Sequence, residues 1–84
     1  MEMTVTLKGE SYQLTYTDEF VTKVEQLGTN FQSIIKELQN SESEILDSPE
    51  EESFFLIGET FSFEGIRSSG TISLTRLLSS ENVL

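Results

Sequence analysis

The chain has 84 residues, of which 15 are Asp or Glu and 5 are Lys or Arg, so its formal net charge at pH 7 is −10. It contains no His and no Cys, which excludes disulfides, thiolate metal sites, cysteine nucleophiles and imidazole bases. At this length we expect a single domain, residues 1–84, with a small hydrophobic core.

Polar and apolar side chains alternate in residues 4–8 and again in residues 12–16. Strict alternation is typical of a strand with one buried face. The two segments are separated by Gly9-Glu10-Ser11, which is a turn signal. The sequence therefore predicts an antiparallel hairpin at the start of the chain.

The next segment changes to a helical period, with apolar residues every three or four positions. They are Phe20, Val24, Leu27, Phe31, Ile34, Ile35 and Leu38. Thr17 or Asp18 can cap this helix. Gly28 interrupts it, but the apolar stripe keeps its phase, so we predict one continuous helix in which Gly28 lets a strand approach closely. The alternative is a break at residues 28–30, with Asn30 capping a second helix.

Residues 40–53 contain six acids, four serines and no base. We predict an acidic Ser/Glu-rich loop within the domain. Inside it, Ser48-Pro49-Glu50-Glu51 has the spacing of a capping box, which favours a short helical turn starting there.

The remainder of the chain predicts further strands. Residues 54–57 and 60–64 flank Gly58-Glu59, which suits a two-residue type II′ hairpin loop. Residues 71–78 alternate again after a turn signal at residues 68–70 and would add a third strand, and residues 79–84 are expected to form a frayed tail. Adjacent Phe54 and Phe55 must point to opposite faces of a strand, so one of them is expected to be exposed.

This order predicts an α+β fold, in which one amphipathic helix packs on a small antiparallel sheet in the order β-β-α-loop-β-β. Phe61 and Phe63 alternate within a strand. Because acids and no bases lie near them, core packing explains them better than a stacking platform for nucleic-acid bases.

The negative charge is concentrated in one part of the sequence. Residues 37–66 carry nine acids and no base, whereas residues 1–36 carry five acids and three bases. One interpretation is a solvated loop that keeps a small domain soluble. The other is a surface that binds a basic partner, with an apolar residue as anchor. The candidate partner-binding residues are Glu42, Glu44, Ile45, Leu46, Asp47, Glu50, Glu51, Glu52, Glu59 and Glu64.

No motif for catalysis is present. The sequence lacks the Gly-rich phosphate loops and the alternating ligands of an EF-hand, so we predict neither an enzyme nor a cofactor or metal site. The acidic balance argues against direct binding to nucleic acid. No run of 18 apolar residues and no signal peptide is present, so we expect no membrane association and a cytoplasmic location, in the host cytoplasm if the chain is phage-encoded.

In size, acidity and helix-plus-sheet content, the chain resembles phage-encoded inhibitors, a class that includes uracil-DNA glycosylase inhibitors and several anti-CRISPR proteins. Ser43-Glu44-Ile45-Leu46 is similar to the short acidic segments of such inhibitors, although the residue order differs and no site is transferred. The resemblance implies a non-enzymatic inhibitor whose carboxylates mimic nucleic acid and block a basic, nucleic-acid-binding protein. The alternative is a structural, assembly or chaperone-like module in which the acidic segment only solubilises the chain.

Overall fold

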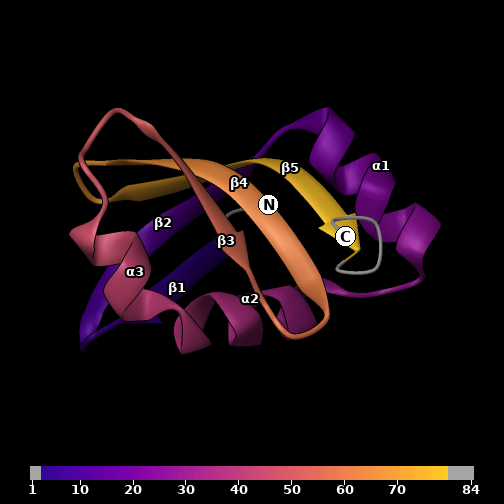
Figure 1. Cartoon of the computed structure of the whole chain (residues 1–84), viewed down its shortest axis with the longest axis horizontal. Helices are drawn as coiled ribbons and strands as arrows, with labels where there is room; N and C mark the ends of the chain where they lie inside the picture. The colour runs from indigo at the N-terminus through magenta and orange to yellow at the C-terminus, as the bar shows by residue number, and fades with distance from the viewer. Residues whose placement is uncertain (1–2, 80–84) are drawn as a thin grey trace.

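The structure, a computed structural model, describes residues 3–79. It contains five strands and three helices in this part of the chain (Figure 1). In chain order they are β1 (Met3–Leu7), β2 (Glu10–Tyr16), α1 (Asp18–Leu27), α2 (Phe31–Asn40), α3 (Glu42–Asp47), β3 (Ser53–Ile57), β4 (Phe61–Ser68) and β5 (Thr71–Ser79).

The predicted N-terminal hairpin is confirmed. Strands β1 and β2 pair antiparallel, with Val5 opposite Tyr12. The two residues between them are Lys8 and Gly9, with φ of 49° and 81°. Positive φ at both positions is the geometry that matches the twist of the flanking strands in a two-residue hairpin. The turn thus begins one residue earlier than the sequence pattern indicated.

The prediction of one continuous helix is wrong, and the alternative of a break is confirmed. Gly28 has φ of 67°, and its N–H donates to the Glu25 carbonyl while that of Thr29 donates to the Val24 carbonyl. This Schellman arrangement ends α1, because glycine adopts the left-handed conformation without penalty. Nothing lies within 4 Å of where a Cβ at Gly28 would be, so no strand approaches there. The Asn30 side chain then accepts the Ser33 N–H at 3.0 Å and caps α2.

The break allows the two helices to contact different parts of the sheet. Helix α1 packs mainly against β5, whereas α2 packs against β1 (Figure 1). Three aromatic rings join the helices to β2: Phe31 lies 4.8 Å from Tyr16 and 6.3 Å from Phe20, measured between ring centroids. Such pairs add a geometric preference to the area that they bury. Thr17 is the cap of α1, and its hydroxyl accepts the Phe20 N–H at 3.2 Å.

The acidic stretch is partly helical, so the prediction of a loop over residues 40–53 is wrong. Helix α3 forms there because Ile45 is fully buried in the core and fixes one side of the helix. The short helical turn expected at Ser48 does not form. Ser48 instead follows the end of α3, and the connection to β3 turns at Glu51, which has φ of 66°.

The five strands form one sheet in the order β1-β2-β5-β4-β3. The α+β class and the third C-terminal strand are confirmed, but the sheet is mixed and not antiparallel throughout. Strand β5 inserts between the two hairpins and runs parallel to β2, with Leu14 opposite Ile72. The loop between β3 and β4 has three residues, 58–60, and Gly58 is not among the glycines with positive φ, so the predicted type II′ turn is also wrong.

The core lies on the helix-covered side of the sheet. Phe61 and Phe63 are both buried, which confirms their role in packing. Phe54 is buried and Phe55 is exposed, as the alternation required. At Gly65, beside the bulge in β4, a Cβ would lie 2.6 Å from the Ser73 carbonyl oxygen, so two strands approach too closely there for any side chain.

In the span from 3 to 79, none of the helices is both long enough and apolar enough to cross a membrane. The frayed tail predicted for residues 79–84 lies outside the described residues except for Ser79, which ends β5.

Candidate functional site

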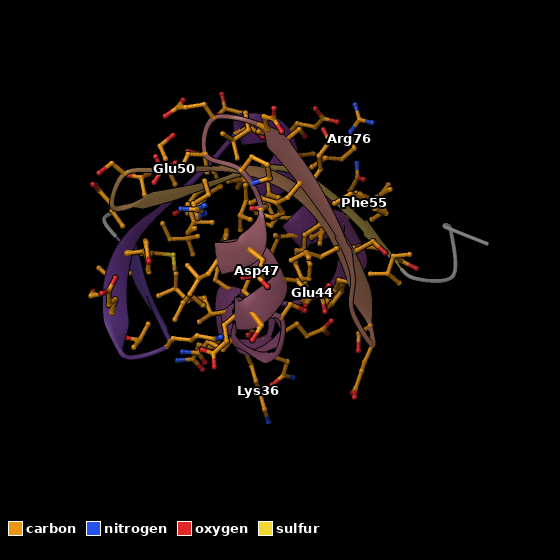
Figure 2. The ribbon with its side chains drawn as sticks, turned by 60° about the vertical axis from the view of Figure 1, so that its left-hand side comes forward. Lys36, Glu44, Asp47, Glu50, Phe55 and Arg76 are labelled. Carbon is orange, nitrogen blue, oxygen red and sulfur yellow. The ribbon has the colours of Figure 1, made fainter. Side chains whose placement is uncertain are left out.

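The exposed acids between α2 and β3 are Glu44, Asp47, Glu50, Glu51 and Glu52, and we call this set the acidic ridge. Glu44 and Asp47 are three residues apart on α3, a spacing that places side chains on one side of a helix. Figure 2 shows both on α3, with Glu50 beyond the end of the helix. All five residues are exposed to solvent.

The ridge is fixed to the domain at its start. The Glu42 carboxylate, at the first residue of α3, accepts the backbone N–H of Lys8 at 2.8 Å. Ile45 is fully buried, and the partly buried Leu46 packs against the same core. A six-residue helix has little stability of its own, so these contacts hold α3 in place.

Arg67 on β4 fixes the far end of the ridge. Its guanidinium forms an ion pair with Glu50, with 3.2 Å between Nη1 and Oε1, and also donates to the Ser48 carbonyl. The backbone N–H of Glu51 donates to the Arg67 carbonyl at 2.9 Å. The Arg67 side chain is only 16% exposed, and its positive charge stabilises the connection between α3 and β3 by binding Glu50 and the Ser48 carbonyl. The sequence marked Arg67 only as the first base after the acidic run.

Four carboxylates of the ridge have no internal partner. Among residues 3–79, neither an ion pair nor a side-chain hydrogen bond reaches Glu44, Asp47, Glu51 or Glu52. These four carboxylates are therefore free to pair with cationic groups of another molecule.

The ten predicted partner-binding residues do not form one face. Ile45 lies in the core and is therefore not part of the candidate surface. Glu42 is half-buried and accepts the hydrogen bond from Lys8. Glu59 lies beyond the other end of β3 and is separated from Glu52 by the whole strand, whose five residues span roughly 17 Å at about 3.3 Å per residue. Glu64 is half-buried in the middle of β4.

One acid of the segment has a structural role that the sequence did not reveal. The Glu37 carboxylate on α2 accepts the backbone N–H groups of Thr60 and Phe61, both at 3.2 Å from Oε1. It thereby ties α2 to the loop between β3 and β4. Helical position alone gave no signal for this contact, because the loop is more than twenty residues away in the chain.

Tyr12 lies beside the anchored end of the ridge. Its hydroxyl donates to Glu10 at 3.3 Å. Partial burial raises the pKa of Tyr12 above its ordinary value of 10.0, and the negative charge of Glu10 adds to the effect. The phenol therefore stays neutral over the physiological pH range.

The described residues contain no cluster of three or more acidic side chains arranged to hold a metal ion. An open hollow between α1 and β5 is lined by residues that include Glu19, Lys23 and Arg76, a mixture of charges without a nucleophile and base in contact. The chain matches no protein family model, no curated protein and no solved structure. The functional proposal is accordingly built on the acidic ridge.

Proposed function

We propose that this chain is a non-catalytic binding protein whose acidic ridge occupies the basic surface of a partner that ordinarily binds nucleic acid, and blocks it. The observation that carries the proposal is the set of four exposed carboxylates without an internal partner, on α3 and on the connection from α3 to β3, a segment that is anchored at both ends. Such carboxylates can occupy a basic groove because they carry negative charge, as phosphates do.

The anchoring supports binding over simple solubility. A loop that only keeps the chain soluble needs charge but no fixed geometry. Here Ile45 and Arg67 hold the ridge in one arrangement. Pre-ordering lowers the entropy that association costs, so each charge contact contributes more to affinity.

The alternative is an assembly module, and a separate observation favours it. Strand β3 lies at an edge of the sheet and exposes Phe55 and Ile57. Exposed apolar side chains on an open edge are a usual means of joining another chain. Sedimentation velocity at increasing protein concentration tests self-assembly, since a monomer at every concentration argues against an assembly formed by this chain alone.

The first experiment captures partners from a native lysate at low and high salt, identifies them by mass spectrometry and repeats the capture with added duplex DNA. We expect a basic, nucleic-acid-binding protein that is released by high salt and displaced by the DNA. A partner that binds equally well in high salt and with excess DNA would overturn the mimicry.

The second experiment measures affinity for that partner with two charge-matched triple variants. The ridge variant carries Glu44→Gln, Asp47→Asn and Glu51→Gln, and the control variant carries Asp18→Asn, Glu19→Gln and Glu25→Gln, all on α1. All six acids are exposed, and both variants lose three negative charges. We expect the ridge variant to bind about tenfold more weakly and the control to change little, because surface ion pairs contribute about 0.2–1 kcal/mol each. Equal losses would show that only net charge matters.

A further inference from the structure

Strand β3 carries, on the face turned away from the core, the two large hydrophobic side chains that are exposed among residues 3–79. Phe55 is 49% exposed and Ile57 is 66% exposed. Strand β3 pairs with β4 alone, so its other edge is open. Figure 2 shows Phe55 on the side of the molecule formed by β3 and β4, away from α3.

The same residues direct their backbone groups toward the open edge. The Gly58 N–H donates to the Phe61 carbonyl at 2.8 Å, in register with the β3–β4 ladder. Antiparallel pairs alternate between bonded and non-bonded, so the peptide groups of Phe54 and Leu56 face β4. Those of Ser53, Phe55 and Ile57 then face outward. Side-chain and main-chain binding groups are thus combined at one edge.

The charges that flank β3 indicate which kind of chain could pair with its open edge. Glu51 and Glu52 precede the strand and Glu59 follows it closely, and all three are exposed. Antiparallel pairing with a second copy centred on Phe55 would bring Glu51 of each copy beside Glu59 of the other. Flanking charges of like sign are a known defence against such self-pairing. A segment with positive charge at its ends meets no such repulsion.

We propose that the open edge of β3 takes up an extended segment of the basic partner as a sixth strand. Apolar side chains of that segment lie beside Phe55 and Ile57, while Lys or Arg residues at its ends pair with Glu51, Glu52 and Glu59. This inference rests on the proposed function, since it names the part of the basic partner that is bound. Main-chain bonds supply affinity in this mode, and the flanking charges supply selectivity.

The outer face beside β3 is mixed in polarity. In the sheet register, Phe55 lies opposite Glu64, which lies opposite Arg76, and Ile57 lies opposite Ser62. The apolar contacts of an added strand would therefore be those with Phe55 and Ile57.

The test uses a synthetic peptide, Lys-Lys-Thr-Val-Thr-Val-Thr-Lys-Lys, with blocked ends. A second peptide has the same sequence and charge but is N-methylated at its three central residues, which removes their N–H donors. A third replaces the lysines by glutamates. We expect the first peptide to bind about tenfold or more tightly than the methylated one, because methylation removes the two Val N–H donors that would face β3. The glutamate peptide should not bind.

Amide hydrogen exchange, followed by NMR, locates the contact. With the lysine peptide bound, the amides of Phe55 and Ile57 should exchange at least about tenfold more slowly, since they gain hydrogen-bond partners. The amides of Phe54 and Leu56, which already face β4, serve as internal controls. Absence of this alternating protection at saturating peptide, or equal affinity for the methylated peptide, would overturn strand addition.

The two proposals fail in different ways. If the ridge variant loses the captured partner while both lysine peptides bind the chain equally, the acidic ridge keeps its role and strand addition is refuted. If the ridge variant keeps the captured partner, the proposed function is refuted, together with the inference that rests on it.

Discussion

Replacing Ile45 by Ala tests whether α3 is held by its single buried side chain. Ile45 has no exposed surface, and it is the one fully buried residue of the six in α3. Truncation to Ala removes core contacts and leaves a cavity, because the sheet on the far side of the core cannot collapse into it. Such substitutions cost about 2–5 kcal/mol of unfolding free energy.

That loss is large for this chain. At about 0.05–0.15 kcal/mol per residue, a domain of this length has an unfolding free energy of about 4–13 kcal/mol. A loss of about 3 kcal/mol would lower the Tm by about 12–24 °C, at about 4–8 °C per kcal/mol for a domain of this size. Anchoring by the contacts of Glu42 and Arg67 would remain, so we expect a folded but much less stable protein.

The assay is urea unfolding followed by far-UV circular dichroism, with two matched variants. Leu46→Ala, at a half-buried neighbour, should cost less than Ile45→Ala. Ser43→Ala, at an exposed position on the same helix, should change the unfolding free energy by less than about 0.5 kcal/mol. An Ile45→Ala protein as stable as the Ser43→Ala protein would refute the conclusion that α3 packs on the core.

Three other predictions concern contacts elsewhere. Glu37→Ala removes the acceptor for two backbone N–H groups and should lower the unfolding free energy, measured with urea, by about 1–3 kcal/mol. Glu37→Gln keeps an oxygen acceptor and should lower it less. Equal losses would contradict the hydrogen-bonding role. Gly65→Ala should cost about 2 kcal/mol or more, because its Cβ would overlap a carbonyl oxygen of β5, and an unchanged unfolding midpoint would disprove this close approach. Tyr12 should ionise above pH 10.0 in a phenolate absorbance titration, and Glu10→Gln should bring its pKa closer to 10.0. Folding raises the pKa of Tyr12, so its contribution to stability is complete below the unfolded value of 10.0 and is lost as the pH rises through the folded pKa. A midpoint of the phenolate titration at or below pH 10.0 would contradict the raised pKa.

Local patterns predicted the strands well because each strand has one buried face. Alternation identified β1, β2 and the C-terminal strands, and it required Phe54 and Phe55 to differ in exposure. The helix break was harder, since the apolar stripe keeps its phase across Gly28. The local signal for the break is Asn30, whose side chain caps α2.

Long-range features left no local trace. The parallel pairing of β2 with β5 joins residues nearly sixty positions apart, and no turn or motif in the sequence indicates it. Helix α3 was hidden because acids and serines dominate its sequence, although Ile45 and Leu46 supplied an apolar pair. Composition located the acidic segment. It could not separate the free carboxylates from Glu37 and Glu42, whose partners are set by tertiary packing.

The position of β5 has a consequence for how the chain acquires its structure. The β1–β2 hairpin and the β3–β4 hairpin share no ladder with each other, and each joins the sheet only through β5. During synthesis, neither hairpin can therefore gain its remaining sheet neighbour until residues 71–79 have been made. Non-local closure of this kind slows folding and leaves partly folded chains prone to aggregation. The acids that precede β3 would then also keep incomplete chains apart while the last strand is still missing.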